Sequence, residues 1–86
     1  MNTETMINTL KQQLETFKMK QKKIEQAIDT VVEILPELDV NNEGFNDLLD
    51  KHPATCELRI LEHKYGWGVE KLTNAISELE EIRDLQ

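Results

Sequence analysis

The sequence predicts an all-α protein in which a long N-terminal coiled-coil helix is followed by two or three shorter helices that form a helical hairpin or bundle. Three observations support this prediction. Residues 3–35 contain neither Gly nor Pro. Their apolar residues recur at alternating spacings of three and four. No segment shows the period-two alternation of a strand, and the length of 86 residues suits one domain.

The first element, residues 1–36, is predicted to be a long amphipathic coiled-coil helix. The helix runs from about residue 3 to residue 35, because Pro36 disfavours helical geometry in the residue before it. Its apolar residues form a narrow stripe, the heptad seam of a coiled coil. The polar Gln21 interrupts this seam, and it either penalises shifted registers between paired helices or extends into solvent. The seam residues predicted to mediate self-association are Ile7, Leu10, Leu14, Phe17, Gln21, Ile24 and Ile28.

The second element, residues 37–52, is predicted to be an acidic connector that contains a short helix. It collects Asn, Asp and Gly, which favour turns. An EF-hand calcium loop can be laid over residues 39–50, but Asn46 replaces the usual apolar residue and Asp50 the usual bidentate Glu. We therefore expect turns here and no metal site, with a divalent-ion sensor as a third hypothesis.

The third element, residues 53–86, is predicted to be a helical hairpin. Pro53 suits the first position of a helix. Trp67 lies between two glycines, where we expect a bend. A final helix of about 17 residues then follows.

The predicted helix lengths imply a partner for the first helix. At 1.5 Å per residue that helix spans roughly 50 Å, whereas the final helix covers roughly 25 Å of it. About half of the seam would then meet water, and its burial would drive association. We expect a homodimer or a higher homo-oligomer, in which the helices pair either parallel or antiparallel.

The charge is divided unevenly along the chain. The net charge is -7, and all of the excess lies from residue 37 onward, where twelve acidic residues face five basic ones. This half is expected either to bind a basic protein surface or only to keep the protein soluble. The residues predicted to contact such a partner are Tyr65, Trp67, Glu70, Glu78 and Glu81.

An alternative function follows from residues 58–79, which resemble a helix-turn-helix. The chain would then be a small DNA-binding transcriptional regulator that dimerises through its coiled coil. Glu62 departs from the motif because that position is usually small and buried. Glu70 and Glu78 add negative charge to the recognition helix, which would repel phosphates.

Other function classes lack their signatures. The sequence shows no nucleophile and base pairing and no phosphate-binding glycine loop, so we expect a protein that is not an enzyme and needs no cofactor. Cys56 and His63 would lie roughly 10.5 Å apart along one helix, which is too far for one zinc ion. With a single cysteine and no long apolar run, a cytoplasmic protein that does not insert into membranes is expected. The sequence therefore favours a regulatory or inhibitory interaction protein.

Overall fold

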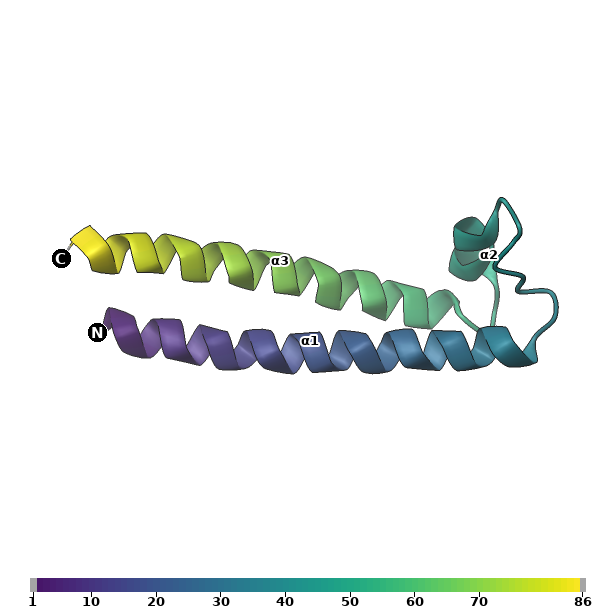
Figure 1. The fold of residues 1–86 in the computed structure, drawn as a ribbon, viewed down its shortest axis with the longest axis horizontal. Helices are drawn as coiled ribbons and strands as arrows, with labels where there is room; N and C mark the ends of the chain where they lie inside the picture. Colours follow the sequence, from purple (N-terminus) through teal and green to yellow (C-terminus); the bar gives the residue numbers. More distant parts are fainter. Residues whose placement is uncertain (1, 86) are drawn as a thin grey trace.

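The computed structural model describes residues 2–85 and confirms the all-α prediction (Figure 1). Its helices are α1 (Thr3–Ile34), α2 (Phe45–Lys51) and α3 (Cys56–Leu85), and no strand forms within the described residues. The two long helices run antiparallel side by side, and α2 lies at the end where the chain reverses direction. The molecule is therefore a rod of 57 × 20 × 17 Å.

The structure confirms the long helix that was predicted for the segment without Gly or Pro. Its N-terminus is capped by Asn2, whose side-chain Oδ1 accepts a hydrogen bond of 2.9 Å from the backbone N–H of Glu4. The helix ends at Ile34, two residues before Pro36. Every predicted seam residue from Ile7 to Ile28 is buried or half-buried. The seam is thus the face that α1 turns toward the rest of the chain.

The prediction of a hairpin within residues 53–86 is wrong, because Cys56–Leu85 is one continuous helix of 30 residues. Gly66 and Gly68 lie inside this helix, although each costs about 1 kcal/mol relative to Ala. Gly68 is buried, and a Cβ atom on it would lie 2.5 Å from two ring carbons of Phe17. The glycine therefore permits close packing of α1 on α3 and does not form a bend.

The expectation that half of the seam meets water is wrong for the same reason. With 30 residues, α3 nearly matches the 32 residues of α1 and lies along most of its length, while α2 and the connector lie at the C-terminal end of α1. Ile7, near the start of the seam, is 0% exposed. The length mismatch that implied self-association through the seam is therefore absent.

The best-buried apolar cluster lies at the end where the chain reverses direction. Its centre consists of Ile28 from α1, Leu38 from the connector and Leu49 from α2. Thr55 is fully buried beside α2, and its hydroxyl donates a hydrogen bond of 2.6 Å to the backbone carbonyl of Leu49. These contacts hold α2, which lies within the predicted connector, against the two long helices.

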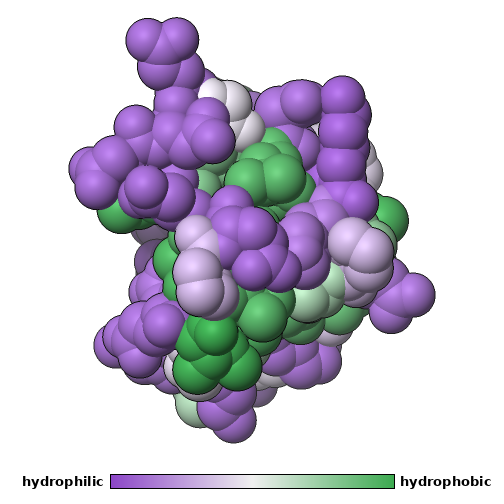
Figure 2. All heavy atoms as spheres, turned by 90° about the vertical axis from the view of Figure 1, so that its right-hand side faces the viewer, coloured by the Kyte–Doolittle hydropathy of each residue, from purple (hydrophilic) through white to green (hydrophobic). Residues whose placement is uncertain are grey.

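Apolar side chains also reach the surface at this end. Ile34 and Val40 are 69% and 66% exposed. Figure 2 views the molecule from this end and shows apolar surface among hydrophilic groups, most of it in the lower half, on the side of α1. The cluster is therefore only partly closed by the connector.

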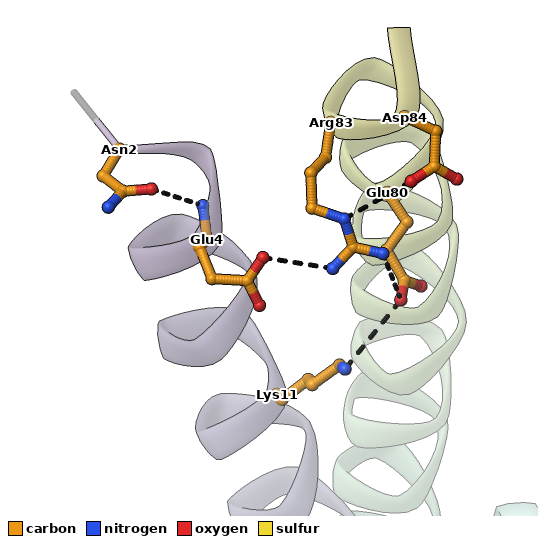
Figure 3. A network of polar contacts seen from close by, with 6 residues as sticks. All are labelled: Asn2, Glu4, Lys11, Glu80, Arg83 and Asp84. Carbon is orange, nitrogen blue, oxygen red and sulfur yellow. Dashed lines mark hydrogen bonds and ion pairs between the residues drawn. The ribbon is translucent and has the colours of Figure 1, made fainter. Parts of the chain in front are cut away.

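Charged side chains join the two long helices at the opposite end (Figure 3). Arg83 Nη1 lies 3.1 Å from Glu4 Oε2, and Lys11 Nζ lies 3.9 Å from Glu80 Oε2. The hydrogen bond that Arg83 donates to the Glu4 carboxylate raises the pKa of Arg83 above its ordinary value. These pairs fix the register of α1 against α3 where the chain ends meet.

Candidate functional site

The outer face of α3, which points away from α1, carries two large exposed apolar side chains. Ile60 is 66% exposed and Trp67 is 63% exposed. A spacing of seven residues is close to two helical turns, so the two side chains lie on the same face. The ammonium group of Lys71 lies 5.6 Å from the centroid of the Trp67 ring. This cation–π contact covers one side of an otherwise accessible ring.

Three exposed glutamates continue the outer surface of α3 toward its C-terminus. Glu70, Glu78 and Glu81 are all exposed, and none of them pairs with a Lys or Arg side chain within residues 2–85. Their carboxylates are therefore directed at solvent. Together with Ile60 and Trp67 they define the surface that we call the outer α3 face.

Tyr65 does not belong to this surface, although it was predicted beside Trp67. Its ring packs edge-on against the ring of Phe17, with centroids 5.3 Å apart and planes at 87°. The ammonium group of Lys20 lies 5.6 Å from the Tyr65 centroid. Because residues two apart on a helix point about 200° apart, Tyr65 faces α1 while Trp67 faces solvent. The sequence analysis placed both in a bend and missed this separation.

The residues predicted for self-association all lie against α3 of the same chain. Ile7 and Ile28 are buried, and Leu10, Leu14, Phe17, Gln21 and Ile24 are half-buried. The side-chain amide of Gln21 lies close to Gly66, since a Cβ built there would be 3.1 Å from its Nε2 atom. Gln21 therefore contacts a position within its own chain, which gives it no evident role in the register between copies.

An open cleft of about 280 Å³ lies between the three helices. Its walls include Arg59, whose Nε lies 2.8 Å from Asp50 Oδ1 and whose Nη1 lies 2.8 Å from Glu62 Oε1. The hydrogen bond that Arg59 donates to Asp50 lowers the pKa of Asp50 and raises the pKa of Arg59. Glu62, which was noted as anomalous for a helix-turn-helix, thus helps to hold α2 on α3 through the same arginine.

The connector forms turns and does not adopt an EF-hand loop. Asp39 Oδ1 accepts a hydrogen bond from the N–H of Asn41, and Asn42 Oδ1 accepts one from the N–H of Gly44. The later acidic positions of the proposed loop lie within helix α2. Within residues 2–85, no group of three or more His, Cys, Asp and Glu side chains is placed to hold a metal ion.

The helix-turn-helix interpretation of residues 58–79 is wrong, because the whole segment lies within the single helix α3. A recognition helix needs a turn and a second helix that crosses it. The alternative of a DNA-binding regulator thereby loses its structural basis. Among the helices of the described residues, none combines the length and apolarity required to traverse a membrane.

Comparisons with known proteins give no match to the chain, whether with protein-family models, with curated proteins or with solved structures. The functional argument therefore rests on the residues themselves. Sequence analysis identified Trp67, Glu70, Glu78 and Glu81 but missed Ile60. The spacing of seven residues between Ile60 and Trp67 is the signal that could have placed both on one face.

Proposed function

We propose that this chain is a small, non-enzymatic interaction protein that binds a protein partner through the outer α3 face. The observation that supports this proposal most directly is the exposure of Ile60 and Trp67, which are 66% and 63% accessible on one face of a rigid helix. Tryptophan is enriched among the residues that dominate binding energy at interfaces. Two such side chains, placed together, are a plausible anchor for a complementary pocket.

The chemistry of the surface defines the partner. Glu78 lies eleven residues after Trp67, which is roughly 16 Å along the helix. The partner therefore needs an apolar pocket for the tryptophan and, at that distance, a group of Lys or Arg side chains for the glutamates. The net charge of -7 would accelerate the encounter with such a basic surface at low salt.

The proposed action is steric. A rod of 57 Å that lies on a basic surface would block other ligands of that surface, which suits a regulatory, inhibitory or chaperoning role. The single cysteine fits a reducing compartment, and we propose the cytoplasm. Self-association through the α1 seam is not part of this proposal, because α3 of the same chain covers that seam.

The test is capture of a partner by immobilised protein, followed by identification and binding measurements with the purified partner. Trp67→Ala is expected to weaken binding by on the order of tenfold or more, as for a central aromatic anchor. Met19→Ala is the matched control, because Met19 is 61% exposed but lies on α1. A partner that binds both variants as tightly as the unmodified chain would refute the proposal.

The electrostatic half of the proposal has a separate test. Replacing Glu70, Glu78 and Glu81 together by Gln is expected to slow association and to flatten its salt dependence, because exposed charges act mainly on the association rate. The same triple replacement should leave the helix content unchanged. An unaltered association rate would show that the acidic residues serve only solubility.

A further inference from the structure

The two flanks of the α1–α3 hairpin differ in chemistry. Lys11 directly follows the seam residue Leu10, and Glu80 directly follows the α3 residue Leu79. Their ion pair of 3.9 Å marks one flank of the hairpin. In the heptad register, the series of every seventh residue from Met6 on α1 and from Leu61 on α3 lies on the opposite flank. We call these the paired flank and the apolar flank.

On α1, the apolar flank begins at Met6, directly before the seam residue Ile7. Steps of seven residues from Met6 reach Gln13, Lys20, Ala27 and Ile34. Only one of these side chains is charged. At the N-terminal end, an open groove of about 310 Å³ is lined by Met6 and Leu10 together with two threonines.

On α3, the apolar flank carries no charged residue at the corresponding positions. Steps of seven residues from Leu61 reach Gly68, Ala75 and Ile82. Leu61 is 38% exposed and Ile82 is 47% exposed. These exposed side chains widen the apolar stripe of α3 beyond the seam that packs on α1.

The paired flank is already covered or charged. At one end it carries the Lys11–Glu80 pair, with Glu4 bonded to Arg83 nearby. At the other end α2 covers it, through the contact of Asp50 with Arg59. The short helix thus lies on the paired flank and leaves Ile34, Leu61 and Ile82 of the apolar flank exposed.

The surface area of the chain gives the size of the missing contact. A compact protein of 10.0 kDa exposes roughly 5,200 Å² by the usual scaling with mass. This rod exposes 6322 Å², which is roughly 1,100 Å² more. A standard protein interface buries about 800 Å² on each partner. The excess is therefore sufficient for one stable interface.

We infer that a second copy of this chain covers the apolar flank, so that two hairpins form a four-helix bundle around a two-fold axis. The hairpin itself supplies an apolar surface of the required length and width. Electrostatics favours this face, because at the positions named above it holds only Lys20, whose ammonium lies over Tyr65, while the chain as a whole carries -7.

The experiment is a measurement of mass in solution by light scattering or sedimentation equilibrium across a wide concentration range. The unmodified chain is expected at about 20 kDa, twice the 10.0 kDa of one chain. Leu61→Lys combined with Ile82→Lys is expected to raise the dimer dissociation constant on the order of a hundredfold or more, because two buried apolar side chains are replaced by charges. Far-UV circular dichroism checks that the variant stays helical.

Ile60→Lys is the matched control. Ile60 adjoins Leu61 in sequence and is 66% exposed, but it lies on the outer α3 face. The control should remain a dimer. An unmodified chain of 10 kDa at every concentration overturns the inference, whether or not the variants fold, and leaves the flank to a helix of another protein. A dimer broken by Ile60→Lys and not by the double variant overturns it as well.

Dimer formation through the apolar flank and partner binding through the outer α3 face can be tested independently. Trp67→Ala should weaken partner binding without changing the dimer mass, since Trp67 lies on the outer α3 face. The Leu61→Lys, Ile82→Lys variant should lose the dimer and still bind the partner through that face.

Discussion

Replacement of Gly68 by Ala tests the claim that this glycine gives space to the Phe17 ring and lets α1 pack closely on α3. A Cβ atom at Gly68 would lie 2.5 Å from both Cδ2 and Cε2 of the Phe17 ring. The ring cannot easily withdraw, because its other contact is the edge-on packing with Tyr65 at 5.3 Å. The variant should therefore strain the contact between the two long helices.

Two opposing effects set the size of the change. Alanine gains about 1 kcal/mol over glycine inside a helix. Overpacking of a tight contact costs about 1–3 kcal/mol. Gly68→Ala is therefore expected to be neutral to destabilising by about 2 kcal/mol. In Gly66→Ala, the new Cβ atom would contact only the flexible side-chain amide of Gln21, at 3.1 Å. This variant should therefore keep most of the free energy that alanine gains over glycine in a helix, and be more stable by about 0.5–1 kcal/mol.

The assay is thermal unfolding followed by circular dichroism at one fixed protein concentration, because association would shift the midpoint. The two variants should differ by roughly 1–3 kcal/mol, which is about 5–20 °C in Tm for a domain of this size. Adding Phe17→Leu should remove the cost of Gly68→Ala, as a double-mutant cycle would detect. A Gly68→Ala variant at least as stable as Gly66→Ala would refute the packing argument.

Three further predictions concern single contacts. Thr55→Val removes a buried hydroxyl and should lower the free energy of unfolding by about 1–3 kcal/mol. The control Thr73→Val, at an exposed site, should change it by less than about 0.5 kcal/mol, and chemical denaturation measures both variants. Asn2→Ala should cost about 0.5–2 kcal/mol and increase amide exchange in the first turn of α1. Because Arg59 lowers the pKa of Asp50, this carboxylate stabilises the fold above its unfolded pKa near 4, and the effect is lost as the pH falls through the lower folded value. Asp50→Asn should therefore be less stable than the unmodified chain at neutral pH and should lose less of its stability on acidification, and an identical pH dependence of the urea midpoint would contradict this.

The first helix could be predicted from the sequence because its signals are local. A heptad pattern without Gly or Pro that ends before Pro36 requires no knowledge of what lies opposite. The state of Gly66 and Gly68 could not be predicted in this way. A glycine pair favours a bend in isolation, and only the position of the Phe17 ring on another helix shows that the missing side chain is a packing requirement.

The candidate site was predictable only in part, for the same reason. Trp67 and the glutamates were identified by residue type, since tryptophan and clustered charge are recognisable without a structure. Whether Tyr65 or Trp67 faces solvent depends on the direction in which each projects from a helix. The predicted bend at these residues left those directions undefined. Once α3 is continuous, Tyr65 must face α1 and Trp67 must face outward.

The order in which the contacts of the α1–α3 hairpin form follows from their separation in the sequence. Near the connector, Asp50 and Arg59 are only nine residues apart in the chain, whereas Glu4 and Arg83 are 79 apart. The entropy of loop closure rises with that separation, and the cluster around Leu49 is beside the short-range contacts. Contacts between the two long helices should therefore form first near the connector and then progressively toward the chain ends. The Glu4–Arg83 contact should be the last to form and the first to open.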